Sequence, residues 1–292
     1  MIASGSRWRA RGAALLLVLW LIVLLTTLVG AFALSARIEQ IQGRVLSHTV
    51  VGDQAARAGL EYALLRLGDL DPQTRWIADG RIYEWSFNGV PLQLRLLDET
   101  GKVDLNAADH PLLAGLMVAL GAEAAEAERL AGAIIDWRDP DDLGQVAGAA
   151  EDPEYAAAGL PYGAKDAPFE AVSELELVLG MPQELAARMA DHVTVYTGRA
   201  LPDPNFAGSV VLRASGIDPG PVLAARQAAE PAPGAAGPAA PGSGTWSIDS
   251  RARLPDGRES RLRAVVRAGG SLPGASYTTL RWQEGTVVPD AE

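Results

Sequence analysis

The stretch RWRARG at residues 7–12, followed by AALLLVLWLIVLLTTLVGAFAL at residues 13–34, decides how this chain is organised. The 22 residues of the second part are free of charge, and about 20 apolar residues suffice for a helix to cross a bilayer. A secretory signal peptide has a shorter apolar core and a cleavage site of small residues beyond it, whereas here helical spacing continues into the polar residues. We therefore predict a retained single-pass helix, with the arginines in the cytoplasm and residues 35–292 across the membrane.

The composition of the chain limits the kinds of functional site that it can form. The chain has no cysteine, so neither a disulfide nor a thiolate is available, and its three widely spaced histidines do not favour a zinc site. Residues 105–195 carry 17 acidic and 4 basic residues, a net charge of −13, whereas the whole chain carries −11. Because phosphate binding requires lysines and arginines, this segment disfavours nucleic acid as a partner and favours a cation.

Periodicity predicts the order of helices and strands. Apolar residues at three- and four-residue steps predict one helix over 13–67, which Asp71-Pro72 ends. Alternation predicts strands at 76–77, 82–87, 92–97, 194–196, 245–254, 259–267 and 277–283, with hairpin turns at Asp79-Gly80, Asn88-Gly89 and Pro255-Asp256-Gly257. Short helices are predicted over 111–120, 122–137, 171–179, 184–192 and within 203–226, around an irregular acidic loop at 138–168.

These elements predict an α+β fold, because strands occur both before and after the helical block. A long N-terminal transmembrane and amphipathic helix packs on an antiparallel sheet, and an all-helical domain is inserted into that sheet. The expected segments are a leader at 1–12, a transmembrane helix at 13–34, a helix with the first strands at 35–104, the inserted domain with its acidic loop at 105–226, a Pro/Ala/Gly linker at 227–244 and C-terminal strands at 245–292.

The junction of the basic leader with the apolar run resembles a type IV prepilin leader. This resemblance implies that a prepilin peptidase cleaves between Gly12 and Ala13 and methylates the new N-terminus. The fifth mature position, where that family usually has glutamate, is occupied by Leu17. The alternative is an ordinary single-span anchor that is not processed.

Four further stretches resemble the protein K family of the type II, or general, secretion pathway. They are GKVDLN at 101–106, IIDWRDPDD at 134–142, EDPEY at 151–155 and PFEAVSEL at 168–175. Asp104 departs from the pattern, since a first asparagine is common there, and PDPNFA at 202–207 matches a second such segment only in part. The missing fifth-position glutamate agrees with this family, which differs from other pseudopilins there.

The resemblance implies a minor pseudopilin with the pseudopilin fold rather than an enzyme. Such a protein is anchored in the bacterial inner membrane with its bulk in the periplasm. It lies at the tip of a short pseudopilus, with minor pseudopilins I and J and other pseudopilins as partners. A tip subunit has no subunit above it, so a glutamate at the fifth mature position would be a costly unpaired carboxylate in lipid. Leu17 is the residue that such a position prefers.

The acidic loop predicts a calcium site. Its five candidate ligands, which fall within fourteen residues, are Asp139, Asp141, Asp142, Glu151 and Asp152. Calcium takes several carboxylate and carbonyl oxygens in flexible geometry, and the same carboxylates without a cation repel one another. The spacing is not that of an EF-hand, and the alternative is a solvated loop with helix-capping aspartates. The neighbouring Asp136 is either a further ligand or a structural carboxylate.

Other functions find less support in the sequence. LELVLGMPQELAARM at 175–189 resembles a helix-hairpin-helix, but it has Gly180 alone of the usual glycine pair and lies in an acidic segment, which disfavours DNA binding. A catalytic serine motif, a phosphate loop and a convincing carboxylate pair are all lacking. Asn106 is interpreted as a helix N-cap with Asp109 as the acidic third residue. The second candidate function is an unprocessed periplasmic adaptor with a calcium-ordered helical domain.

Overall fold

The computed structural model describes residues 10–71, 73–141, 143–146, 148–228, 242–269 and 276–287, with the backbone alone for 10–13, 36–48 and 286–287. The chain divides into two compact units, Met1–Gly52 and Asp53–Glu292. Each unit is described by itself.

The first unit consists of the greater part of helix α1, which runs from Ala10 to Leu67 and so begins three residues before the predicted start. In the described part of the chain, Ala14–Ser35 is the one segment long and apolar enough to cross a membrane, with a mean hydropathy of 2.7. The hydroxyls of Thr26 and Thr27 donate to carbonyls of the preceding turn at 2.7–3.0 Å. Polar groups satisfied within the helix suit an apolar solvent, and the segment suggests a single-pass membrane anchor.

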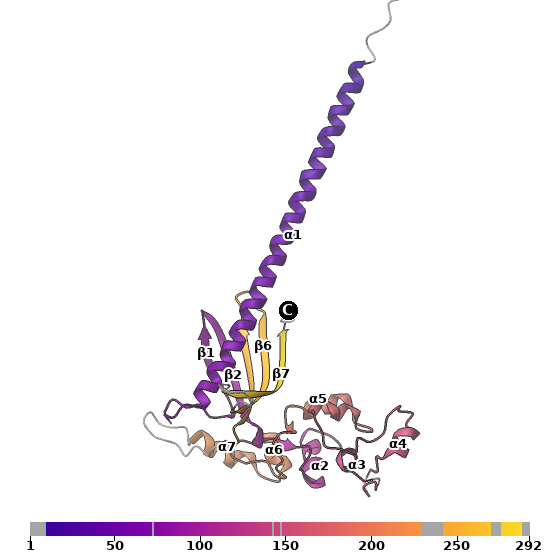
Figure 1. Ribbon diagram of the computed structural model, residues 1–292, viewed down its shortest axis with the longest axis vertical. Coiled ribbons are helices and arrows are strands. Elements are labelled where there is room, and N and C mark those ends of the chain that lie inside the picture. Colours follow the sequence, from indigo (N-terminus) through magenta and orange to yellow (C-terminus); the bar gives the residue numbers. More distant parts are fainter. Residues whose placement is uncertain are drawn as a thin grey trace, which may run out of the picture. The chain divides into compact units, whose positions relative to one another are not determined.

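The second unit contains a five-stranded antiparallel sheet (Figure 1). Its strands, in spatial order, are β1 (Asp79–Phe87), β2 (Val90–Asp98), β5 (Thr245–Arg253), β6 (Glu259–Ala268) and β7 (Tyr277–Val287). Because β2 pairs directly with β5, all the elements between them are inserted into the sheet. The predicted fold class, a helix packed on an antiparallel sheet with a helical insertion, is therefore confirmed.

The turns of the sheet agree with the sequence at Asn88-Gly89, where φ values of 48° and 78° give the left-handed conformation that a tight hairpin needs. Two predictions at the first strand are wrong. Trp76-Ile77 is not a strand, and Asp79-Gly80 is the irregular start of β1 rather than a hairpin turn. The Trp76 ring instead stacks on Tyr83 with centroids 4.1 Å apart, so this segment packs through its aromatic side chain and leaves no strand for a hairpin to join.

One face of the sheet packs on the last turns of α1. The shared core is built of small helix residues against leucines and other apolar residues of the central strands: Ala55, Ala56, Leu60, Ala63, Leu92, Leu94, Leu96, Ile248 and Leu262. Polar contacts fasten the helix to β7, with Arg57 Nε 2.7 Å from Glu284 Oε1 and the Tyr277 hydroxyl donating to Glu61 at 2.6 Å. Burial, followed by the hydrogen bond and the charge of Glu61, raises the pKa of Tyr277 to about 12.

Gly59 allows α1 to approach the sheet closely, and we expect Gly59→Ala to destabilise the protein. A Cβ at this position would lie 2.5 Å from Ser250 Oγ and 2.8 Å from a Leu94 methyl carbon. Overpacking of a core costs about 1–3 kcal/mol, which exceeds the helical preference of about 1 kcal/mol for alanine over glycine. Urea denaturation measures the loss. Gly285→Ala on β7, where a Cβ meets nothing within 4 Å, is the control and should show no such loss; a more stable Gly59→Ala protein would contradict the close packing.

The insertion between β2 and β5 is mainly helical and has its own core. Its elements are η1 (Glu99–Gly101), β3 (Val103–Asp104), α2 (His110–Ala119), α3 (Ala124–Arg138), α4 (Asp152–Ala157), η2 (Val172–Leu177), α5 (Gln183–Met189), β4 (Val193–Thr194), α6 (Ser209–Ala214) and α7 (Pro219–Ala228). The two short strands pair in parallel, so the start of the insertion lies beside residues 193–194. The largest fully buried side chains include Leu113, Leu130, Ile134 and Tyr155.

The insertion differs from the sequence prediction in three places. The acidic loop is not irregular throughout, because α4 forms within it; Pro153 lies in the first turn and Tyr155 anchors the helix in the core. Residues 172–177 form a 3-10 helix rather than part of a longer helix. The strand predicted at 194–196 is Val193–Thr194. The predicted linker at 227–244 lies for the most part outside the described residues.

Candidate functional site

The acidic loop follows α3, where Asp139 takes the C-cap position. Asp139 Oδ1 is buried and has no hydrogen-bond partner among the described residues. Burial raises the pKa of this carboxyl group, and the charges of Asp141 and Asp136 raise it further, whereas Arg138 opposes them. A buried, unsatisfied carboxylate oxygen is costly, and its repulsion by other carboxylates is the situation that a bound cation relieves.

Asp136 fastens the acidic loop to α3. Its side chain is fully buried, and the carboxylate accepts hydrogen bonds from the backbone amides of Ala150 at 2.8 Å and Gln145 at 3.0 Å. Burial raises the pKa of Asp136, although the two amide hydrogen bonds act in the opposite direction. Of the two roles that the sequence left open for Asp136, the geometry therefore provides the structural one directly.

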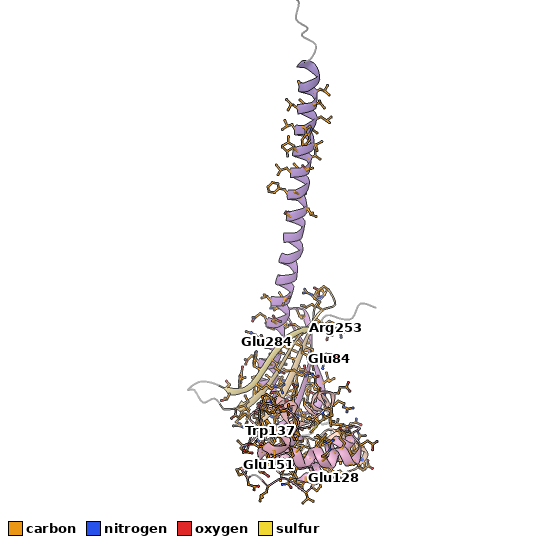
Figure 2. All side chains as sticks on the ribbon, turned by 90° about the vertical axis from the view of Figure 1, so that its right-hand side faces the viewer. Glu84, Glu128, Trp137, Glu151, Arg253 and Glu284 are labelled. Carbon is orange, nitrogen blue, oxygen red and sulfur yellow. The ribbon has the colours of Figure 1, made fainter. Side chains whose placement is uncertain are left out.

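Of the predicted calcium ligands, the four that the structure describes do not form one cluster. Asp141 Oδ1 accepts from the amide of Leu143 at 3.0 Å, while Glu151 and Asp152 lie at the start of α4, with Glu151 6% exposed. Asp142 lies outside the described residues. Across the ranges that the structure describes, no group of three Asp, Glu or His side chains is close enough to hold a metal ion. Figure 2 labels Glu151 in the helical insertion.

A buried ion pair marks the point where the chain leaves the sheet. Lys102 Nζ lies 2.6 Å from Glu99 Oε1 and 2.6 Å from Ser247 Oγ of β5, and Ser247 also donates to the Glu99 carboxylate. Glu99 is 1% and Lys102 9% exposed. Between them, Gly101 lies so close to the Phe206 carbonyl oxygen that a Cβ would be 2.5 Å from it. The GKVDLN motif thus joins the insertion to the returning strand.

Asp104 binds residues 197–198 of the insertion, which are distant from it in the sequence. Its Oδ2 accepts from the amides of Thr197 and Gly198 at 2.9 and 2.8 Å and from the Thr197 hydroxyl at 2.8 Å. Oδ1 accepts from the amide of Asn106 at 2.9 Å. Every partner is a donor, so a carboxylate, which only accepts, satisfies this set better than an amide does. This explains why aspartate stands where the sequence analysis noted that asparagine is common.

Asn106 is not the N-cap that the sequence predicted. Asp109 caps α2, with Oδ1 accepting from the amide of Leu112 at 3.0 Å. Asn106 instead bridges to the backbone of Phe169, donating to its carbonyl at 2.9 Å and accepting from its amide at 2.7 Å. An amide side chain matches a backbone donor and acceptor at once. It therefore joins two motifs 63 residues apart.

Further links connect the remaining motifs. Arg138 donates to the carbonyls of Leu105 and Ala108, the second at 2.7 Å. The Glu174 carboxylate pairs with Lys165 at 2.8 Å and accepts from the amides of residues 170 and 171. Burial alone would raise the pKa of Glu174, but Lys165 and these amides lower it. The motif residues thus serve mainly to join segments through polar contacts. Sequence reasoning missed this role because the partners of Asp104, Asn106 and Arg138 lie 30 or more residues away.

The predicted processing residues lie in the first unit. Gly12 and Ala13 fall within the first turns of the α1 backbone, and their side chains are outside the described set. Cleavage at this bond therefore stays a prediction.

Comparisons with known proteins agree on one family. A family model described as "Type II secretion system (T2SS), protein K" matches residues 92–198, which begin in β2 and include most of the insertion. The chain is similar to "Type II secretion system protein K" of Klebsiella pneumoniae, with 30% identity over 212 residues, 66% of this chain and 65% of the relative. The relative of the same name from Pectobacterium carotovorum subsp. carotovorum is 28% identical over 218 residues, 64% of this chain and 63% of the relative. The chain thus spans slightly less than two thirds of the length of these relatives.

A solved structure supports the fold. A chain of the crystal structure of the GspK-GspI-GspJ complex from the type 2 secretion system of enterotoxigenic Escherichia coli matches with a TM-score of 0.54. The match covers 86% of this chain and 99% of that chain at 19% sequence identity. The fold of this chain is therefore similar to that of a solved protein.

Proposed function

Because this chain belongs to the protein K family of the type II secretion system, we propose that it acts as a minor pseudopilin. In this role it lies at the tip of a periplasmic pseudopilus, initiates its assembly and supports protein export across the outer membrane. The observation that carries the proposal is the insertion itself: the matched family region begins in β2 and includes most of the helical insertion, to residue 198. The role is structural, and no catalytic residue is assigned.

The N-terminal segment supports the membrane part of this proposal. We place Ala14–Ser35 in the bacterial inner membrane, with the arginines of residues 7–11 in the cytoplasm and the sheet and insertion in the periplasm. Leu17, 71% exposed on α1, occupies the position where a glutamate would meet a neighbouring subunit. A leucine there avoids an unpaired carboxylate in lipid, which suits a subunit with none above it. Residues 105–226 are the proposed inserted domain, and 227–244 are the proposed linker.

Minor pseudopilins I and J are the proposed partners, because the solved structure with the same fold is described as the GspK-GspI-GspJ complex. Full-length protein co-expressed with I and J and purified in detergent should elute as a complex, with its mass measured by light scattering. The exposed apolar residues Val50 and Val51 of α1 are the proposed contact.

Changing both valines to aspartate should weaken the complex, because it places charge in an apolar helix contact. Leu177→Asp on the insertion, also an exposed apolar residue, is the matched control and should leave the complex intact. A strictly monomeric native chain in the presence of both partners would favour the second candidate function, an unprocessed adaptor.

Calcium is proposed as the cation of the acidic loop. The chemistry of the donors suits this ion, since all of them are carboxylates, although the described ones are not gathered into a cluster of three. Asp139 supplies a buried oxygen without a partner among the described residues. Asp139, Asp141 and Glu151 would provide the main ligands, with Asp142 and Asp152 assisting. When bound, the ion supplies positive charge that offsets the repulsion between these side chains and orders residues 138–155.

We expect calcium to raise the melting temperature of the protein and a chelator to lower it. A ligand that binds only the folded state stabilises it by about 2.7 kcal/mol at a hundredfold excess over Kd. Magnesium should substitute poorly, because it requires tight octahedral geometry. Asp141→Asn combined with Glu151→Gln should abolish the response without lowering the calcium-free melting temperature, since repulsion is relieved. Glu123→Gln with Glu176→Gln, which removes the same charge elsewhere in the insertion, should keep the response; equal melting curves with and without calcium would contradict the site.

A further inference from the structure

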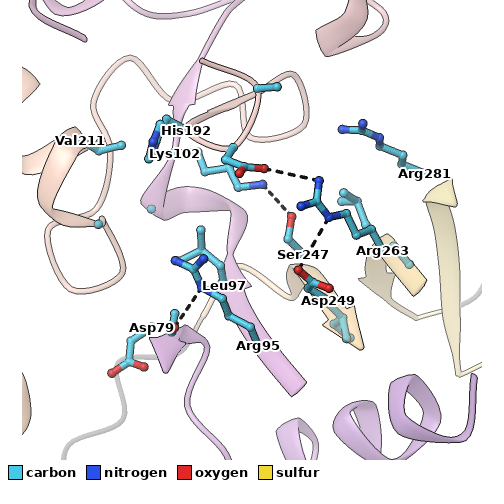
Figure 3. Close-up of a pocket in the computed structure, with 18 of the residues that line it drawn as sticks. Asp79, Arg95, Leu97, Lys102, His192, Val211, Ser247, Asp249, Arg263 and Arg281 are labelled. Carbon is cyan, nitrogen blue, oxygen red and sulfur yellow. Dashed lines mark hydrogen bonds and ion pairs between the residues drawn. The ribbon is translucent and has the colours of Figure 1, made fainter. Parts of the chain in front are cut away.

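A cavity of about 350 Å³ lies between the sheet and the helical insertion, all within the second unit (Figure 3). Strands β2, β5, β6 and β7 supply one wall, and residues 190–192 and 208–211 of the insertion supply the other. Among the described residues that line it are five arginines and one lysine, against three aspartates. Although the whole chain has a net charge of −11, the lining of this cavity therefore carries more basic than acidic side chains.

The strand register explains how these arginines come together. Alternate residues of a strand point to opposite faces, so the leucines at 92, 94 and 96 of β2 face α1 while Arg95 lies on the other face. The pairing sets Arg95 opposite Asp249, Asp249 opposite Arg263, and Arg263 opposite Gln283. Arg251 lies directly opposite Arg261. Like charges directly opposite each other on neighbouring strands reduce the stability of a sheet. Sheet stability therefore does not by itself explain why arginines occupy both positions.

The aspartates of the cavity neutralise only part of this charge. Asp249 receives three arginines: Arg261, Arg251 at 3.2 Å and Arg263 at 3.7 Å. Burial would raise the pKa of Asp249, but the hydrogen bonds from Arg261 and Arg251 lower it, so the carboxyl group stays ionised at neutral pH. Asp79, which lines the cavity, pairs at 2.8 Å with Arg81, which does not line it. Asp191 also pairs with Arg263, at 3.8 Å. Two carboxylates therefore share three guanidinium groups, and Arg95 and Arg281 lie outside this network.

Two of the arginines have only uncharged partners. Arg95 Nε donates to the Gly80 carbonyl at 3.2 Å, and Arg281 Nη2 donates to Gln283 Oε1 at 2.9 Å. Neither forms an ion pair with a carboxylate in the described part of the chain. They lie on β2 and β7, with β5 and β6 between them. Three spacings of about 4.8 Å separate these strands by about 14 Å. Arg95 is in register with Gln283, and Arg281 lies two residues, about 7 Å, further along β7, so the two backbones are about 16 Å apart.

We infer that this cavity binds an acidic peptide segment of a partner protein, with one carboxylate received by Arg95 and a second by Arg281. A single small anion cannot span the two arginines, whereas an extended peptide rises about 3.3 Å per residue and carries side chains i and i+4 about 13 Å apart. Guanidinium groups bind carboxylates through paired hydrogen bonds, which supplies both affinity and orientation. A long polyanion such as nucleic acid is disfavoured by the helical insertion, because residues 105–195 carry a net charge of −13.

The test uses the full-length chain in a zwitterionic detergent and a fluorescent peptide, Gly-Glu-Ser-Gly-Ser-Glu-Gly, followed by anisotropy. The native chain should bind it saturably, more weakly at high salt, and at least tenfold more tightly than the peptide with both glutamates replaced by glutamine. Arg95→Gln combined with Arg281→Gln should weaken binding of the acidic peptide at least tenfold. This double variant leaves Asp249 with its three arginines, so the melting temperature should not change.

Arg253→Gln provides the matched control, because Arg253 lies on β5 beside Glu259 and outside the cavity. It removes one arginine of the same sheet and should leave the affinity within twofold. An equal loss in this control would show diffuse attraction and overturn the inference. Inorganic phosphate that displaces the peptide as well as unlabelled peptide does would reassign the cavity to small anions. The absence of saturable binding to the native chain would also overturn it.

Discussion

Replacing Gly12 by leucine is expected to abolish the proposed processing, and with it the proposed role in pseudopilus assembly and secretion, while membrane insertion continues. Insertion depends on the apolar run, which the change leaves intact. Processing depends on the residue that precedes the cut, and the proposed cut lies between Gly12 and Ala13. The variant should therefore lose the function completely, although the fold of its second unit should not change.

Mass spectrometry of the N-terminus measures this directly. The native protein should lack residues 1–12 and carry a methylated Ala13, whereas the Gly12→Leu protein should keep Met1 and still appear in the membrane fraction. Gly30→Leu is the matched control, since a Cβ there meets nothing within 4 Å and the change lies in the same helix. It should be processed normally. An intact Met1 in the native protein, or secretion supported by a processed Gly12→Leu protein, would contradict the proposal.

Replacing Lys102 by methionine is expected to lower the free energy of unfolding by about 3–5 kcal/mol, the cost of leaving one charge of a buried pair without its partner. Lys102 is the sole cation within hydrogen-bond distance of Glu99 in the described residues, and Glu99 is 1% exposed. Loss of the ammonium group also removes the hydrogen bond to Ser247, which ties the start of the insertion to β5. Urea denaturation of the full-length chain in detergent measures the change.

Two variants distinguish a buried charge from simple loss of packing. Combining Lys102→Met with Glu99→Leu removes both charges and should recover most of the stability, because replacing a whole buried pair by apolar residues is close to neutral. Arg57→Met breaks an exposed pair with Glu284 and should have far less effect, since solvent screens that interaction. If Lys102→Met costs no more than Arg57→Met, the pair contributes little and the insertion is held by other contacts.

Local patterns in the sequence predicted much of this architecture. Asn88-Gly89 predicted a tight hairpin, and its two positive φ values are those that these residue types adopt most readily. Strands on both sides of a helical block predicted an insertion, which the pairing of β2 with β5 confirms. The prediction was wrong at Trp76-Ile77 because apolar residues with strand-like character also serve in aromatic stacking, and only packing against Tyr83 decides between these uses.

The sequence by itself determined the features that arise within a few residues: the apolar run of α1, the alternation of the strands, the turns and the concentration of acidic residues in the insertion. The tertiary structure alone decided which distant groups meet. Asn106 looked like a helix cap because asparagine often is one, yet it bridges to Phe169, 63 residues away. The arginines at 95, 263 and 281 look like ordinary surface charges along the chain, and only the register of β2, β5, β6 and β7 sets them on one face of a cavity. The physical reason is that periodicity fixes which face a side chain occupies, whereas its partner depends on strand pairing and on the packing of segments far apart in the chain.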